Sequence, residues 1–334
     1  MGLSIREIIP KKEISFPQLC GKTIVIDAFN VIYQFLSTIR QYDGTPLQDK
    51  NGRITSHLSG LFYRNLSLLS EGIKIIYVFD GEPPELKKTL REKRESVKKS
   101  ANEKYEEAKE NENIEDMNRY SKQNVHITRE IIEESKQFLL AMGIPVIQAP
   151  GEGEAQASFL AKRKDIYAVG SQDYDCLLFG APMLIQNLTL SRKRKTISGI
   201  VEIHPELITL EYVLNHLQIN HEQLICLGIL TGTDYNPAGI KGVGQKRALE
   251  IVKKFKSPVE IFAQFPEADF DWQEIFQLFK KPEIHERVEI EFPKINENKI
   301  KEILMSHDFL EERIDKQLVK LQEIKEKAKQ KKLF

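Results

Sequence analysis

Five short runs of apolar, largely β-branched residues are spaced along the first 190 residues of the chain. They cover residues 22–30, 74–84, 143–154, 165–175 and 183–190. Patterns typical of amphipathic helices separate several of them, at residues 57–72, 127–143 and 154–164. Near-continuous apolar strands are typical of a parallel sheet that is covered on both faces. Because strands and helices alternate, the pattern predicts an α/β fold with a doubly wound, mainly parallel sheet.

Other stretches depart from this alternation. Residues 84–125 contain few apolar side chains but many good helix formers, so we expect a helical excursion from the body of the protein. Residues 49–54 have the composition of a small hairpin turn. After residue 205 the pattern becomes helical, and no strong further strand is predicted. Within 311–332 an apolar stripe in a Lys-rich helix predicts a last helix lying on the body; the stripe is Ile314, Leu318, Leu321 and Ile324.

Composition narrows the class of protein. The chain has 334 residues, of which 41% are hydrophobic and 29% are charged, so a packed core with a highly charged surface is expected. No apolar run approaches the roughly 18 residues that a membrane span needs, and the N-terminus has no signal-like apolar region. Three isolated cysteines fit a reducing compartment. We therefore expect a soluble intracellular protein without a membrane partner.

The charge is balanced overall but unevenly distributed. There are 49 basic and 49 acidic residues, so the net charge is zero. Basic residues dominate residues 85–104, 191–196, 239–256 and 313–334. Such runs are often solvated helix faces, but segregated basic patches around an acidic centre also suit a protein that grips a phosphate backbone while holding cations.

Acidic residues stand where a parallel sheet would bring them together. Asp27, Asp80 and Asp173 each follow an apolar run, Asp175 lies in the same loop as Asp173, and the remaining three are Glu152, Glu154 and Asp234. Sites in open α/β sheets form beyond the carboxyl ends of the strands. Two carboxylates about 4 Å apart repel by about 4 kcal/mol at an effective dielectric near 20, so a cluster needs cations. A donor set made only of oxygen favours two Mg²⁺ ions, with Mn²⁺ as a substitute, over Zn²⁺.

Each acid has an ordinary alternative explanation. Glutamates favour a helix N-terminus, and an aspartate after a strand is often a turn former. The joint placement of seven acids makes these alternatives less favourable than a metal site.

A second group of residues points to phosphate binding. The turn Gly239-Ile-Lys-Gly-Val-Gly244 opens a basic amphipathic helix, an arrangement similar to a helix–hairpin–helix module. Glycines let backbone N–H groups approach a phosphate, and a helix N-terminus favours an anion. The expected DNA contacts are Lys241, Gly242, Gly244, Lys246 and Arg247. The turn follows no strand, which argues against a dinucleotide-binding fold.

These motifs and their order resemble the flap endonucleases of the archaeal and eukaryotic type, which are structure-specific 5′ nucleases. The resemblance runs from Gly2 to about residue 260 and is carried by six segments, namely 26–41, 55–64, 77–87, 149–157, 171–180 and 228–248. It implies a nuclease core of the PIN-like type and cleavage near the base of a 5′ flap in branched DNA, during lagging-strand maturation and long-patch repair. It also implies a monomer.

The resemblance assigns roles to individual residues. It implies that Asp27, Asp80, Glu152, Glu154, Asp173, Asp175 and Asp234 hold the metal ions. Lys87 and Arg94 correspond to the family's catalytic basic pair on a helical arch, here residues 82–126. Tyr33 would stack near the scissile nucleotide, Arg40 would contact DNA, and Gly2 would lie near the site after removal of Met1. Residues 221–258 would hold duplex DNA, with K⁺ bound at the hairpin, inside one nuclease domain covering 1–310.

Residues 311–334 form a basic helix and tail that ends in part of a motif. Flap endonucleases commonly bind the sliding clamp, PCNA, through Gln, two residues, an aliphatic residue, two more and an aromatic pair. Gln330, Lys331, Lys332 and Leu333 match its first half, so we expect weak clamp binding.

Three other interpretations are open. A 5′ exonuclease or gap-cutting enzyme of the same family would share every acid. A small RNA-cutting nuclease of the same sheet type would be much shorter, and an inactive DNA- or clamp-binding relative would not need all seven acids.

Overall fold

The computed structural model describes residues 3, 5–82, 85–87, 100, 104–105, 125–190, 192–196 and 199–330. The strands are β1 (Lys12–Glu13), β2 (Thr23–Asp27), β3 (Lys74–Phe79), β4 (Val146–Gln148), β5 (Ala168–Gly170), β6 (Met183–Gln186), β7 (Lys193–Thr196), β8 (Gly199–Glu202) and β9 (Glu206–Thr209). The helices of the sheet region are α1 (Ala28–Thr38), α2 (Ser56–Ser70), α5 (Arg129–Ala141), α6 (Gly153–Leu160) and α7 (Asp175–Leu178). The later helices are α8 (Leu210–Leu217), α9 (His221–Thr231), α10 (Gln245–Lys254), α11 (Pro258–Phe262), α12 (Trp272–Lys280), α13 (Glu297–Ser306) and α14 (Glu311–Gln330). Two short 3₁₀ helices are η1 (Phe16–Leu19) and η2 (Glu85–Lys87).

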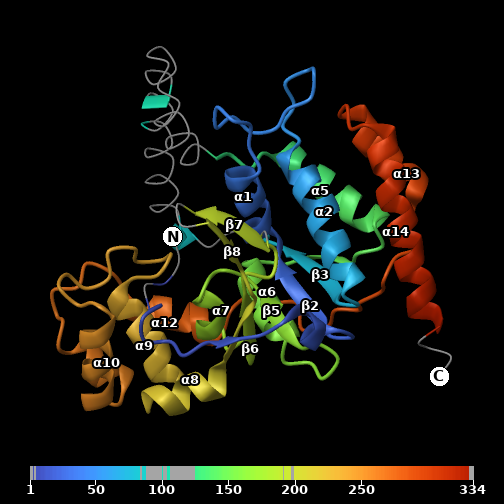
Figure 1. Ribbon diagram of the computed structural model, residues 1–334. Coiled ribbons are helices and arrows are strands. Elements are labelled where there is room, and N and C mark those ends of the chain that lie inside the picture. The colour runs from blue at the N-terminus through green and yellow to red at the C-terminus, as the bar shows by residue number, and fades with distance from the viewer. Residues whose placement is uncertain are drawn as a thin grey trace.

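A seven-stranded sheet forms the centre of the molecule (Figure 1), in the order β1-β9-β6-β5-β2-β3-β4. The five strands from β6 to β4 are parallel. Strand β9 pairs antiparallel with β6, and β1 pairs antiparallel with β9, so β1 runs in the same direction as the five. All five apolar runs of the sequence contain one of the parallel strands. The predicted doubly wound, mainly parallel sheet is confirmed. Its switch point lies between β2 and β5, because the chain builds outward from β2 in both directions.

The alternation of side chains along the strands divides the core into two layers. In β2, Ile24 and Ile26 point into one apolar cluster, and Val25 points into the other. The first cluster joins the sheet to α1, α2, α5, α13 and α14, and the second joins it to α6 to α12. Figure 1 shows these two groups of helices on opposite sides of the strands. Both faces of the sheet are therefore covered, which explains why its strands carry so few polar residues.

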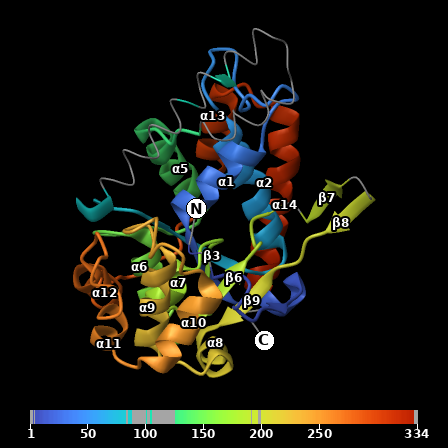
Figure 2. The same ribbon diagram turned by 90° about the vertical axis from the view of Figure 1, so that its left-hand side faces the viewer.

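One prediction about the second half of the chain is wrong. A further strand, β9, lies after residue 205 and pairs with β6 through Ile185 and Leu207. It is short, half-buried along most of its length, and followed directly by α8, so its apolar residues merge with the helical pattern. The strands β7 and β8 form a separate two-stranded ribbon in the basic stretch, and the ribbon projects from the body in Figure 2.

Two smaller predictions agree with the structure. In the hairpin turn at 49–54 the amide of Asp49 donates to the carbonyl of Arg53 at 3.0 Å, and Gly52 has a positive φ of 78°. In α14, Ile314, Leu318 and Leu321 are buried in the core cluster that includes α2, and Ile324 is half-buried. Within the ranges described above, no helix has both the length and the apolar character that crossing a membrane requires.

The predicted arch at 82–126 lies largely outside the described residues. The structure does place η2 at its beginning, and Lys87 is the last residue of that element.

Candidate active site

The predicted carboxylates lie at the carboxyl ends of the parallel strands. Asp27 is the last residue of β2, and its Oδ1 accepts a hydrogen bond from the amide of Asn30 at 3.3 Å, which caps α1. Asp80 follows β3 directly, and the strand register pairs Asp27 with Val78 on β3. Glu152 is the N-cap residue of α6, and Glu154 lies in the first turn of that helix.

The other three acids come from the opposite side of the switch point. Asp173 lies between β5 and α7, Asp175 is the first residue of α7, and Asp234 follows the end of α9. Gly170 pairs with Ile26, so the loop after β5 begins beside Asp27. Strands that are distant in sequence thus bring their terminal acids to one edge of the sheet.

Close backbone approach fixes the two loops that carry Asp80 and the two glutamates. The amide of Gly153 donates to Asp80 Oδ1 at 2.6 Å, and the amide of Gly81 donates to the carbonyl of Gly151 at 2.6 Å. A Cβ atom on Gly153 would lie 2.6 Å from Asp80 Oδ1, and one on Gly81 would lie 2.3 Å from two carbonyl oxygens. Glycine is therefore required at both positions for this arrangement.

The acids perturb one another strongly. Burial, then the charge of Asp80 and that of Asp173, raises the pKa of Asp27 to about 7. Burial and then Asp173 raise the pKa values of Glu154 and Asp175 well above their usual range. Burial and then Asp234 raise the pKa of Asp173. Because Glu152 also acts on Asp175, all seven carboxylates belong to one electrostatic cluster.

Lys87 supplies positive charge to this cluster. Its ammonium forms an ion pair with Glu152 and lies 3.6 Å from Asp234 Oδ2. Its side chain is 20% exposed. Burial lowers the pKa of Lys87, but the carboxylates of Glu152 and Asp234 raise it by more, so the net shift is upward. The amine is therefore held in its charged form between the two acids.

The donor atoms suit hard cations. Asp173 Oδ1 and Asp175 Oδ1 are buried and have no hydrogen-bond partner among the described residues. An uncompensated buried carboxylate oxygen is costly, and all seven donors are oxygens of the kind that Mg²⁺ and Mn²⁺ prefer. In the described part of the chain, no three such side chains are already gathered closely enough to hold an ion. Carboxylates that repel one another are expected to spread unless a cation draws them in.

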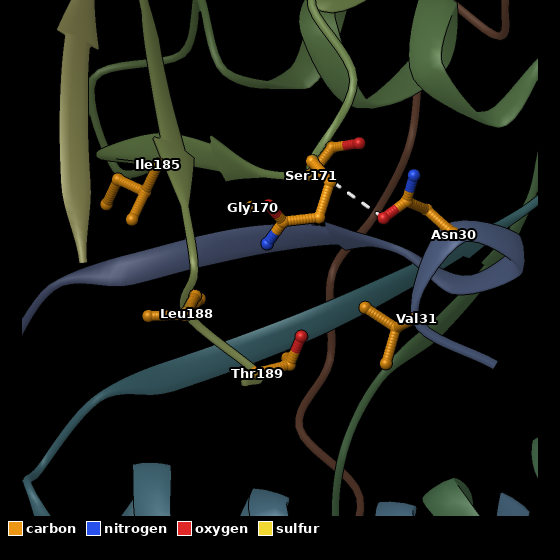
Figure 3. Close-up of a pocket in the computed structure, with 8 residues that line it drawn as sticks. Asn30, Val31, Gly170, Ser171, Ile185, Leu188 and Thr189 are labelled. Carbon is orange, nitrogen blue, oxygen red and sulfur yellow. Dashed lines mark hydrogen bonds between the residues drawn. The ribbon is translucent and has the colours of Figure 1, made fainter. Parts of the chain in front are cut away.

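A small hollow beside the acids is lined by residues of β5, β6 and α1 (Figure 3). Its lining includes Asn30, Gln172 and Thr189. Asn30 Oδ1 accepts a hydrogen bond from the amide of Gln172 at 3.3 Å, and the Gln172 carbonyl accepts one from Gln186 Nε2 at 2.8 Å. Asn30 thus connects the loop of Asp27 to the loop of Asp173. This residue was not predicted from the sequence, where its only signal is its position one helical turn after Asp27.

Tyr33 lies on α1, the helix that begins directly after Asp27, and Arg40 lies just beyond the C-terminal end of that helix. The Tyr33 side chain is 43% exposed, which leaves its ring accessible. Arg40 is half-buried, and its Nη1 donates to the carbonyl of Gly44 at 2.6 Å, so part of its guanidinium is engaged within the protein.

The helix–hairpin–helix residues lie on the surface, away from the sheet. The turn between α9 and α10 exposes Gly242, with φ of 78°, and Gly244, and no atom lies within 4 Å of where either Cβ would be. Gly244 is the N-cap residue of α10, and no side chain at that position supplies a hydrogen bond to the first amides of the helix. The basic side chains around this turn are all exposed; they are Lys241, Lys246 and Arg247.

Two predicted residues, Gly2 and Arg94, lie outside the described residues. One further residue near the acids was not predicted from the sequence. Tyr235 is 8% exposed, and its ring centroid lies 5.4 Å from Lys87 Nζ. The sequence could have suggested Tyr235 only because it follows Asp234 directly, and an aromatic residue at such a position is usually part of the hydrophobic core.

Two family models and many curated relatives match this chain. Residues 4–101 match the XPG N-terminal domain, and residues 143–234 match the XPG I-region. Flap endonuclease 1 of Pyrococcus furiosus is 50% identical over 333 residues, which cover 99% of this chain and 97% of that protein.

Two solved structures of nucleases have a similar fold. Flap endonuclease-1 from Methanococcus jannaschii superposes with a TM-score of 0.77 at 40% identity, covering 97% of this chain and 98% of that one. The catalytic core of Rad2 in complex with a DNA substrate has a TM-score of 0.72 at 22% identity, covers 96% of this chain and 100% of that one, and supports the fold alone. From its identity to these relatives over nearly its whole length, the chain belongs to the flap endonuclease 1 family of structure-specific nucleases.

Proposed function

We propose that this chain hydrolyses a phosphodiester near the base of a 5′ DNA flap with two Mg²⁺ ions, for which Mn²⁺ can substitute. The observation that carries the proposal is the cluster of seven mutually perturbing carboxylates at the sheet edge, with two buried oxygens lacking partners among the described residues. Flap endonucleases in general use divalent metal ions. The ligands would be Asp27, Asp80, Glu152, Glu154, Asp173, Asp175 and Asp234.

Two such ions supply an activated water and stabilise the leaving oxygen in phosphodiester hydrolysis. The residues of the chain orient the substrate around them. Lys87 already carries a buried positive charge beside Glu152 and Asp234, where negative charge on a scissile phosphate would develop. Tyr33 presents an exposed ring on α1, the helix that begins directly after Asp27, for stacking on a base. Arg94 and Gly2 belong to the proposal by family correspondence.

The DNA substrate would contact a second surface. The N-terminus of α10, which has no side-chain cap, together with the exposed Lys241, Lys246 and Arg247, suits the phosphates of a duplex without base preference. We place the expected K⁺ ion at carbonyls of the same hairpin. The biological substrate would be branched DNA during replication and repair inside the cell, bound by a monomer.

The test is cleavage of an end-labelled 5′-flap duplex with mapping of the product. We expect cutting near the flap base with Mg²⁺ and none with a chelator. Single-stranded RNA serves as a negative control. If a gapped duplex is cut faster than the flap, the exonuclease or gap-endonuclease alternative is the better description.

We also propose that the sliding clamp, PCNA, is a partner through residues 330–334, of which Lys331–Phe334 lie outside the described residues. With half of the aromatic-anchored motif, weak binding is expected, because aromatic anchors carry most of the energy of such interfaces. Calorimetric titration of the clamp tests this. Submicromolar affinity that survives deletion of residues 328–334 would refute it.

A further inference from the structure

The aromatic ring beside Lys87 is held rigidly. Tyr235 packs edge-on against Phe279, with ring centroids 5.3 Å apart and planes at 75°, and Phe279 packs against Phe179 at 4.9 Å. Its backbone is fixed as well, because its amide donates to Thr233 Oγ1 at 3.2 Å. Thr233 Oγ1 in turn donates to Asn236 Oδ1 at 2.7 Å. Ring and backbone are thus braced from two directions.

The face of this ring is turned to a cation. Lys87 Nζ lies 5.4 Å from the ring centroid, within the roughly 6 Å over which a cation is attracted to an aromatic face. The same nitrogen is paired with Glu152 and is 3.6 Å from Asp234 Oδ2. The ring of Tyr235 therefore borders the ammonium together with the two acids.

A rigid ring beside Lys87 limits the positions that its flexible side chain can adopt. A lysine side chain is a flexible four-carbon stem with about 2 kcal/mol of rotamer entropy, and η2, which ends at Lys87, is only three residues long. Acids alone do not fix a point charge in one position, because each carboxylate offers two oxygens to it. A buried ring with a fixed plane restricts the ammonium to one side of the acidic cluster.

We propose that Tyr235 is a positioning residue that holds the Lys87 ammonium over the metal-binding acids through the face of its ring. The inference rests on the proposed function, in which Lys87 acts on the scissile phosphate. Tyr235 itself does not touch the reacting atoms in this proposal. The Tyr235 hydroxyl also hydrogen-bonds to Glu152. The proposal assigns the positioning role to the ring rather than to this bond, so loss of the hydroxyl alone is expected to have little effect.

The test is a double-mutant cycle read out by single-turnover cleavage of a 5′ flap. Tyr235→Leu, which removes the ring, should lower the rate by about 3- to 30-fold, the range that a cation–π contact supplies. Tyr235→Phe, which keeps the ring, should stay within about twofold of wild type. In a Lys87→Ala background, Tyr235→Leu should lower the rate by less than about twofold further, because its effect acts through the missing ammonium.

A matched control uses a second lysine–tyrosine pair. Lys22 Nζ lies 4.9 Å from the ring centroid of Tyr167, near the start of β2 and so at the opposite end of that strand from Asp27. Tyr167→Leu removes the same kind of contact and should leave the cleavage rate unchanged. Flap affinity measured in a chelator should be the same for wild type and for Tyr235→Leu.

Several results would overturn the proposal. Equal losses from Tyr235→Leu with and without Lys87 would show that the ring acts independently of the ammonium, and a Tyr235→Phe rate as low as that of Tyr235→Leu would assign the role to the hydroxyl. If thermal melting shows that Tyr235→Leu is unfolded, Tyr235→Met, which fills a similar volume without a ring, takes its place in the cycle. A wild-type protein that does not cut flaps would instead contradict the proposed function.

Discussion

A single aspartate in the acidic cluster has two opposed effects on the molecule. Asp173 is surrounded by acids, and one of its oxygens is buried without a hydrogen-bond partner among the described residues. Its charge is therefore unfavourable for the folded protein on its own. The same charge becomes favourable when a divalent cation binds, because anything that binds only the folded state stabilises it. Stability and metal binding should thus respond in opposite directions to its removal.

We expect Asp173→Asn to abolish flap cleavage while flap affinity stays within about threefold of wild type, since one amide for one carboxylate removes no phosphate contact. In a chelator the variant should melt at or above the wild-type temperature, because a buried repulsive charge is gone. With Mg²⁺ the wild type should gain more in melting temperature than the variant. The matched control is Asp165→Asn, an exposed acid paired with Arg163 at 2.9 Å, which should change neither property. A variant that still cuts within about threefold of wild type would contradict the assignment of Asp173 as a ligand.

At the residue scale, some members of the candidate site could be predicted from the sequence and others could not. The seven acids could be predicted because each stands at or near the end of an apolar run or a helix. In a parallel sheet, the carboxyl ends of the strands lie at one edge, so such residues come together there. The contact between Lys87 and Tyr235 could not be predicted, since it joins residues 148 positions apart through packing that no local pattern encodes. The same is true of Asn30 and Gln172, whose polar side chains suggest only a capped helix and a loop.

A partly buried network of hydrogen bonds joins several helices on one face of the sheet. Glu134 of α5 binds two imidazoles: its Oε2 lies 2.8 Å from His57 Nε2 on α2, and its Oε1 lies 2.5 Å from His307 Nε2. His307, which follows α13, reaches Asp49 Oδ2 in the hairpin turn at 3.2 Å. One carboxylate therefore helps to connect α2 and α5 with the C-terminal helices, and its partner imidazoles are almost completely buried.

We expect Glu134→Gln to reduce the free energy of unfolding by about 1.5–3 kcal/mol at neutral pH, the usual range for hydrogen bonds to a charged group. Burial raises the pKa of Glu134, but hydrogen bonds from His57 and His307 lower it more, and the net shift is downward. A lowered folded-state pKa stabilises the protein above the unfolded-state value, and this contribution is lost as pH falls through the folded-state pKa. The difference between the two proteins in urea unfolding should therefore narrow below about pH 4.

Glu133→Gln is the matched control for this measurement. Glu133 is 54% exposed and pairs with Lys136 on the surface at 2.8 Å, so its removal should cost less than about 1 kcal/mol. Equal destabilisation by both variants, or a difference that is constant down to about pH 3, would show that the network does not contribute as described.

At the scale of helices and strands, an element could be predicted where its hydrophobic pattern was long and regular. The five parallel strands and the helices α2, α5 and α6 were predictable because long apolar runs and 3.6-residue periodicity identify them. The strands β1 and β9 were not, since a two-residue edge strand and its four-residue neighbour draw their stability from pairing rather than from their own composition.

At the scale of the whole molecule, the net charge is zero, but acidic and basic residues gather on different surfaces. The acids gather at the carboxyl edge of the sheet, while exposed bases surround the turn between α9 and α10. Figure 1 shows α10 and α14 at opposite sides of the molecule, with the sheet between them. The proposed substrate, a branched DNA, has a duplex and a flap, so binding at one surface and cutting at another would match its shape. Affinity and chemistry should therefore be separable by mutation.

The double variant Lys246→Ala/Arg247→Ala tests this separation. Removing one phosphate-binding side chain should reduce the slope of log affinity against log salt by about 0.9, so the double variant should fall about 1.8 below the wild-type slope on a flap substrate. At saturating DNA its single-turnover rate should remain close to that of wild type, because neither side chain belongs to the acidic cluster. Lys253→Ala/Lys254→Ala removes the same charge from the other end of α10 and should change the slope less, since those side chains lie in the last turn of the helix. An unchanged slope in the first variant, or equal reductions in both, would mean that the hairpin does not hold the duplex and that long-range charge alone accounts for the attraction.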